Sequence, residues 1–155
     1  MNIDIDDLTR PAVHALLQEH LANMHDLSPA DQVFALDLAQ LRAPGITFWT
    51  AWDGQQLLGC GALKELSPTH GEIKSMRTPT ALRRRGAGRA LLQKIIDEAQ
   101  SRGYWRLSLE TGSHVDFQKA HSLYLGAGFE YAGPFGGYVE NPHSVFMTRR
   151  LNPAA

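Results

Sequence analysis

The chain has 155 residues, a formal net charge of −1 and a hydrophobic fraction of 43%. This length suits one domain with a sizeable core, and the composition excludes a disordered chain. The near-zero charge argues against nucleic acid as a partner recognised by overall charge. The single cysteine, Cys60, excludes an intramolecular disulfide and a cysteine-based zinc site.

The first residues do not resemble a secretory signal, because they lack a basic start and an apolar stretch. No apolar run approaches the length of a membrane span. We therefore expect a cytoplasmic protein with no membrane partner, folded as a single domain over residues 1–155. Cys60 lies in the apolar run 57–63 and is expected in the core.

The first third of the chain predicts one short strand and two helices. Ile3 and Ile5 alternate with aspartates, as in a half-buried strand. Thr9 is the expected cap of a helix whose apolar residues recur at helical spacing. The Ser-Pro-Ala-Asp sequence at 28–31 predicts a second helix start, and this helix is expected to run to about Arg42.

The rest of the chain predicts strands with two further helices. The strands are expected at 46–52, 56–66, 72–78, 106–111, 129–131 and 145–151, the first two joined by an Asp-Gly turn. A helix is expected over 87–101, between the third and fourth of these strands, and another starts at 113–116. The third strand, its helix and the fourth strand form a βαβ unit.

The most informative motif is a loop of arginines and glycines. Arg83, Arg84 and Arg85 lead into Gly86 and Gly88, directly before a predicted helix. Glycines expose consecutive backbone N–H groups, and the positive end of a helix dipole favours an anion there. The arginines add charge-assisted donors. The loop therefore predicts a phosphate-bearing ligand, although a basic helix start can also be a solvated surface.

Two familiar phosphate motifs do not fit this loop. A dinucleotide fingerprint needs a third glycine where Leu91 stands, and a P-loop needs Gly-Lys-Ser/Thr. The remaining pattern, Arg-x-x-Gly-x-Gly at 83–88, resembles the pyrophosphate motif of the GNAT superfamily of acyl-CoA-dependent N-acyltransferases. The block Ala-x-x-Leu-Tyr-x-x-x-Gly-Phe at 120–129 is similar to a second motif of that superfamily. The resemblance extends from the first strand to Leu151.

The resemblance implies a fold and an activity. The fold is α/β (α+β), with a mixed, mostly antiparallel sheet of about seven strands flanked by about four helices. The activity is transfer of an acetyl group from acetyl-CoA to a primary amine of a small molecule or peptide, by direct attack in a ternary complex and without a metal. A non-catalytic acyl-CoA-binding sensor is the alternative, and a homodimer is compatible with the resemblance.

The resemblance also implies which residues hold the cofactor. The preceding strand supplies main-chain groups to the pantetheine arm, and the loop and helix start bind the pyrophosphate. Two residues of the later helix region are expected beside the cofactor together with Tyr124. The set is Met76, Arg77, Thr78, Arg83, Arg84, Arg85, Gly86, Ala87, Gly88, Arg89, Ala90, Phe117, Ala120 and Tyr124.

Two residues are the catalytic candidates. The resemblance places Tyr124 near the sulfur, where a phenol with an ordinary pKa of about 10 suits protonation of a thiolate. The alternative is a core aromatic packed at helical spacing. Glu72 resembles a glutamate that deprotonates the acceptor in some members, and its alternative is a solvated or ion-paired side chain. Glu110 is a weaker base candidate.

The acceptor is expected between the strand at 72–78 and two other segments. Alternation places Glu72, Lys74 and Met76 on one face, where Lys74 neighbours Glu72 and is able to bind a carboxylate of the acceptor. A small carboxylated amine is therefore predicted. The walls are completed by His20 and Met24 on the first helix and by Tyr138 in the last loop.

Overall fold

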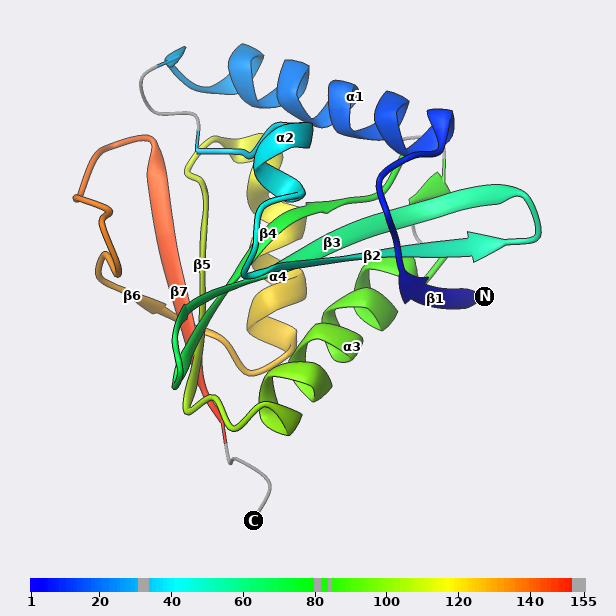
Figure 1. The fold of residues 1–155 in the computed structure, drawn as a ribbon. Helices are drawn as coiled ribbons and strands as arrows, with labels where there is room; N and C mark the ends of the chain where they lie inside the picture. The colour runs from blue at the N-terminus through cyan, green and yellow to red at the C-terminus, as the bar shows by residue number, and fades with distance from the viewer. Residues whose placement is uncertain (31–33, 80–81, 84, 152–155) are drawn as a thin grey trace.

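The computed structural model describes residues 1–30, 34–79, 82–83 and 85–151 (Figure 1). Its seven strands form one sheet in the order β1-β2-β3-β4-β5-β7-β6. The strands are β1 (Asn2–Ile5), β2 (Ile46–Asp53), β3 (Gln56–Ser67), β4 (His70–Arg77), β5 (Arg106–Gly112), β6 (Glu130–Ala132) and β7 (Ser144–Arg150). Only β4 and β5 pair in parallel. The mixed, mostly antiparallel sheet is therefore confirmed.

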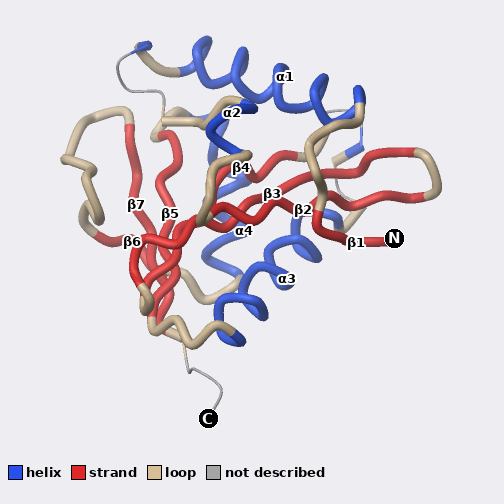
Figure 2. Tube along the Cα trace, in the orientation of Figure 1, coloured by secondary structure: helices blue, strands red, loops and turns tan. Residues whose placement is uncertain are grey.

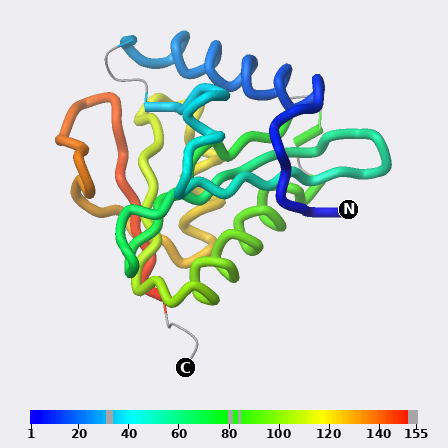
Figure 3. Tube along the Cα trace, viewed as in Figure 1, coloured from blue at the N-terminus to red at the C-terminus, as the bar shows by residue number. Residues whose placement is uncertain are grey.

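Helices cover both faces of this sheet (Figure 2). They are α1 (Pro11–Leu27), α2 (Leu38–Leu41), α3 (Ala87–Ser101) and α4 (Gln118–Gly126), the last preceded by a 3-10 helix, η3 (Val115–Phe117). One core lies under α1 and α2 and includes the fully buried Cys60, as expected. A larger core lies under α3 and α4. The chain begins at one edge of the sheet and reaches β6 at the other (Figure 3).

The second helix is not continuous as predicted, because residues 34–37 are not helical. Ser28 ends α1: it is extended, and its N–H donates to the carbonyl of Met24 in the last turn. The following proline explains this, because Pro29 disfavours a helical conformation at Ser28. Ala30 has a 3-10 conformation, and α2 is a single turn capped by Asp37 and Gln40; positions 31–33 lie outside the described residues.

The start of α1 also differs by one residue from its prediction. Arg10 is the N-cap, and Pro11 occupies the first helical position, where its missing N–H costs nothing. Thr9 instead donates its hydroxyl to Asp7. No helix in the described ranges is both long and apolar enough to cross a membrane.

A bulge in β4 changes which residues face which side. Ala62 pairs with Lys74 but Cys60 pairs with Arg77, so β4 carries one extra residue. Ser75 absorbs it in a left-handed conformation, φ 55°. The expectation that Met76 shares a face with Glu72 and Lys74 is therefore wrong. Met76 packs into the α3 core, and Arg77 takes the face of Lys74 toward α1.

The two parallel strands separate at the same level. Their pairing ends at Ile73 and Leu109, whereas β4 continues to Arg77 and β5 to Gly112. Where two neighbouring strands diverge, their facing main-chain N–H and C=O groups lose each other as partners and need another one. The separation places such groups at the centre of the molecule, between the helices of both faces.

Candidate active site

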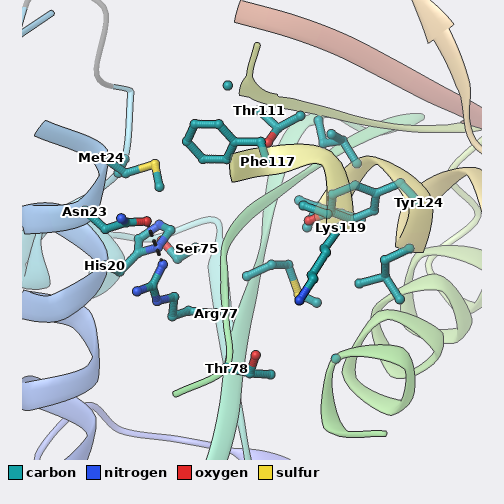
Figure 4. A pocket seen from close by; sticks show the side chains of 18 of the residues that line it. His20, Asn23, Met24, Ser75, Arg77, Thr78, Thr111, Phe117, Lys119 and Tyr124 are labelled. Carbon is teal, nitrogen blue, oxygen red and sulfur yellow. Dashed lines mark hydrogen bonds between the residues drawn. The ribbon is translucent and has the colours of Figure 1, made fainter. Parts of the chain in front are cut away.

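A cavity of about 640 Å³ opens where β4 and β5 separate. Its walls come from α1, β4, β5, α4 and the loop before α3 (Figure 4). It unites most of the predicted site: His20, Met24, Lys74, Met76, Arg77, Thr78, Arg83, Arg85, Gly86, Ala87, Gly88, Arg89, Phe117, Ala120 and Tyr124. Ala90, Glu72 and Tyr138 do not line this cavity, and Arg84 lies outside the described residues.

The arginine–glycine loop forms one end of the cavity. Gly86 is the N-cap of α3 with φ 81°, a conformation that a residue with a Cβ rarely adopts. A Cβ built at Gly88 would meet no protein atom nearer than 3.6 Å. Arg83, Arg85 and Arg89 are exposed and make no hydrogen bond or ion pair with any described residue. Their guanidinium groups are therefore available to a ligand.

Tyr124 lies on the opposite wall, on α4. Figure 4 shows it across the cavity from His20, Asn23 and Arg77. Its ring packs on Phe129 at 5.8 Å between centroids, and its hydroxyl has no partner within the described chain. Burial raises the pKa of Tyr124 well above its usual value, so the phenol is protonated at neutral pH. Both the packing and the acid role are compatible with this placement.

Polar side chains of α1 and β4 contact one another at the α1 wall, where the Arg77 side chain is largely buried and Glu19 is exposed. Arg77 donates to Asn23 Oδ1 at 2.9 Å and to Glu19 Oε1 at 2.8 Å. Three buried atoms beside the cavity have no described partner: His20 Nδ1, Ser75 Oγ and Arg77 Nε. Burial, followed by the charge of Arg77, lowers the pKa of His20 to about 4. His20 is therefore neutral at pH 7.

Glu72, Lys74 and Tyr138 form a compact cluster at the edge of the cavity. Tyr138 donates its hydroxyl to Glu72 Oε2 at 2.6 Å, and Lys74 Nζ lies 3.3 Å from the same oxygen. Lys74 also donates to Tyr138 at 2.9 Å and to the carbonyl of Phe34 at 2.9 Å. Burial and the Glu72 carboxylate raise the pKa of Tyr138 above its usual value. Glu72 and Tyr138 line a second cavity of about 270 Å³.

Unlike Glu72, Glu110 lines the larger cavity, as does Asp116. Glu110 accepts a hydrogen bond from Ser144 at 2.8 Å, and burial raises its pKa above the ordinary value. Ser75, Asn23 and Phe34 line the larger cavity and were not predicted as site residues. Their places depend on a bulge and on long-range packing, and no local pattern marks either.

The profile of the acetyltransferase (GNAT) family matches residues 11–129. The uncharacterized N-acetyltransferase YsnE of Bacillus subtilis is 55% identical over 151 residues, covering 97% of this chain and 100% of that protein. The uncharacterized N-acetyltransferase YedL of Escherichia coli is 48% identical, covering 96% and 94%. The IAA acetyltransferase of Azospirillum brasilense is 38% identical, covering 90% and 91%.

Solved structures agree with this relationship. A crystal structure from Klebsiella pneumoniae, assigned as an acyl-CoA N-acyltransferase, superposes with a TM-score of 0.81 at 27% identity, covering 97% of both chains. A Bacillus subtilis acetyltransferase in complex with CoA shares the fold at a TM-score of 0.66 and 20% identity, covering 97% of this chain and 99% of that one. The chain therefore belongs to the GNAT family of acetyl-CoA-dependent N-acetyltransferases, as its two motifs predicted.

Proposed function

We propose that the chain transfers the acetyl group of acetyl-CoA to a primary amine of a small molecule or peptide, by direct attack in a ternary complex. One observation carries the proposal. A single cavity joins three unpaired arginines and a left-handed glycine cap to a buried, protonated tyrosine. The loop suits a pyrophosphate, and the tyrosine suits a leaving thiolate.

The cofactor would lie along the gap between β4 and β5. Its pyrophosphate would meet the N–H groups at 86–89 with Arg83, Arg85 and Arg89 around it, whereas the N–H of Ala90 donates to the carbonyl of Gly86 within α3. The pantetheine arm would pair with main-chain groups of β4 beyond Ile73, where β5 no longer pairs. Phe117 and Ala120 would close the gap from the α4 side. No metal is needed for any of these contacts.

The reaction needs a base, an electrophile and an acid. The amine nitrogen attacks the thioester carbonyl, the new C–N bond forms, and the C–S bond breaks. Glu72 would take the proton that the amine loses, and Tyr124 would give its hydroxyl proton to the thiolate. Tyr124 then regains a proton from solvent. Glu110 is the alternative base, since it lines the larger cavity and burial raises the pKa of its carboxyl.

Two measurements test the proposal. Acetyl-CoA should raise the melting temperature by mass action, and an amine screen should release CoA thiol. Because one relative is an IAA acetyltransferase, IAA belongs in that screen. Absence of any thermal shift at millimolar acetyl-CoA would overturn the proposal. Binding without thiol release from any acceptor would favour a non-catalytic acyl-CoA sensor.

The base is assigned by a matched pair of variants. Glu72→Gln should lower turnover strongly and leave acetyl-CoA affinity unchanged, whereas Glu110→Gln should keep most of the activity. The reverse ranking would transfer the base role to Glu110. Both variants preserve side-chain shape, so a loss in either reports on charge and proton transfer rather than on packing.

A further inference from the structure

The second cavity has a distinct composition. It lies between β3, β4, the segment before α2 and the loop that joins β6 to β7. Three aromatic rings, Phe34, Phe135 and Tyr138, share its wall with Lys64 and Glu72. Its volume of about 270 Å³ suits a small molecule rather than a folded partner.

The aromatic wall is held in place by contacts among the rings. Phe34 and Phe135 meet Tyr138 edge to face, with centroids 5.2 Å and 5.0 Å away. Phe146 on β7 supports Tyr138 and Phe135 at 5.6 Å and 6.1 Å. A rigid aromatic wall binds an apolar or aromatic body at little entropic cost.

Two side chains of opposite charge, one on β3 and one on β4, lie opposite each other without forming an ion pair. Lys64 on β3 is the direct cross-strand partner of Glu72 on β4. In the described chain Lys64 makes no ion pair or hydrogen bond, and Glu72 uses only Oε2 for its contacts. The cavity therefore offers one uncommitted ammonium and one uncommitted carboxylate oxygen, Glu72 Oε1.

Lys74 differs from Lys64 in this respect. Its ammonium has three N–H groups, and the structure gives it three acceptors: Glu72, Tyr138 and the carbonyl of Phe34. An acceptor carboxylate would have to displace one of them. Lys64 has no such partner to give up. It is therefore the better partner for the acceptor carboxylate, which the sequence analysis placed at Lys74.

We propose that the second cavity binds the acceptor as an amino acid with an aromatic or branched apolar side chain. Glu72 Oε1 holds the amine, Lys64 holds the carboxylate, and the rings of Phe34, Phe135 and Tyr138 enclose the body. This inference rests on the proposed acetyl transfer. Phe34 lines both cavities, and Lys74 of the larger one lies 3.3 Å from Glu72 of the second, so an amine bound at Glu72 would lie where the two cavities adjoin.

The test compares amino acids with the amines that lack only the carboxylate. Suitable pairs are phenylalanine with phenethylamine, leucine with isoamylamine, and tryptophan with tryptamine. We expect the wild-type protein to prefer the amino acid in at least one pair by roughly 10-fold in kcat/KM. Lys64→Met should raise KM for that amino acid roughly 5- to 30-fold and leave KM for its amine within about 2-fold.

Control variants separate the role of the Lys64 charge from that of the aromatic wall. Lys94→Met removes an exposed lysine on α3 and should change neither KM. Phe135→Ala should raise KM for both members of a pair, because it removes wall area and no charge. Equal effects of Lys64→Met on amino acid and amine, or no pair that prefers the amino acid, would overturn the inference. Acetyl-CoA binding and thiol release with simple amines would still stand in that case, whereas their loss would overturn the proposed function itself.

Discussion

The two ends of the site treat their positive charges in opposite ways. At the α3 loop, Arg83, Arg85 and Arg89 are exposed and have no described partner. At the other end, Lys74 and Arg77 are buried and bonded to Glu72 and Glu19. In the proposed function an anionic cofactor would supply the counter-charges of this loop, which needs no protein partner for them. Buried charges near the reacting groups must be paired before substrate arrives, because an unpaired buried charge is costly.

The largest effect is expected when the buried Glu72–Lys74 pair is broken. Lys74→Met should lower the free energy of unfolding by about 3–5 kcal/mol, because it leaves the Glu72 carboxylate buried without its cation. Lys64→Met, across the strand from the same glutamate, should change stability by less than about 0.5 kcal/mol. Urea unfolding of the two variants beside wild type measures this contrast. Similar stabilities for both would mean that the Glu72–Lys74 pair contributes little.

The open end is tested by blocking it. Gly88→Val should weaken acetyl-CoA binding by about 100-fold or more, because its side chain would occupy the space over the loop N–H groups. The fold should tolerate it, since protein atoms leave room at this position and valine is no worse than glycine within a helix. Calorimetry with acetyl-CoA measures the loss. Gly126→Val, at the end of α4 where a Cβ would meet no atom within 4 Å, is the control. Normal affinity in Gly88→Val would place the phosphates elsewhere.

A smaller change separates binding from chemistry. Tyr124→Phe should keep acetyl-CoA affinity within a few fold and lower kcat by about 100-fold, the low end for loss of a general acid. The reason is that phenylalanine has no hydroxyl proton to give to the leaving CoA thiolate. Single-turnover rates across a range of pH measure the effect. Wild-type turnover at every pH would reduce Tyr124 to a packing residue.

The smallest effect concerns pH and stability. Because burial lowers the pKa of His20 to about 4, the unfolded chain binds its proton more readily, and stability falls on acidification between pH 6.5 and 4. From pH 6.5 to 5.5 this residue should remove about 1 kcal/mol. His20→Gln should flatten that part of the profile relative to wild type. An unchanged slope in the variant would show that His20 is not the titrating group.

Local patterns were enough for most of the fold. Alternation gave the strands, and the loop at 83–88 gave the family, because both signals depend on neighbours in sequence. The prediction of one continuous second helix failed because a Ser-Pro pair can end the preceding helix as well as start a new one. The outcome depended on Pro29 acting on Ser28.

The candidate site was predicted in composition but not in arrangement. Alternation cannot anticipate a bulge at Ser75, a residue whose type does not favour a left-handed conformation. That one residue moved Met76 away from Lys74 and brought Arg77 beside α1. The contacts of Tyr138 with Glu72 span 66 positions of sequence and depend on the packing of the last loop.

The surroundings of Cys60 have a practical consequence for every assay suggested above. Its thiol is fully buried, donates to the carbonyl of Ser75, and burial raises its pKa to about 12. Disulfide reagents react with thiolates, so the folded protein should not react with these reagents. A colorimetric thiol reagent would then report CoA alone. A cysteine introduced on the surface would give a single labelling point for spectroscopy without removal of the native one.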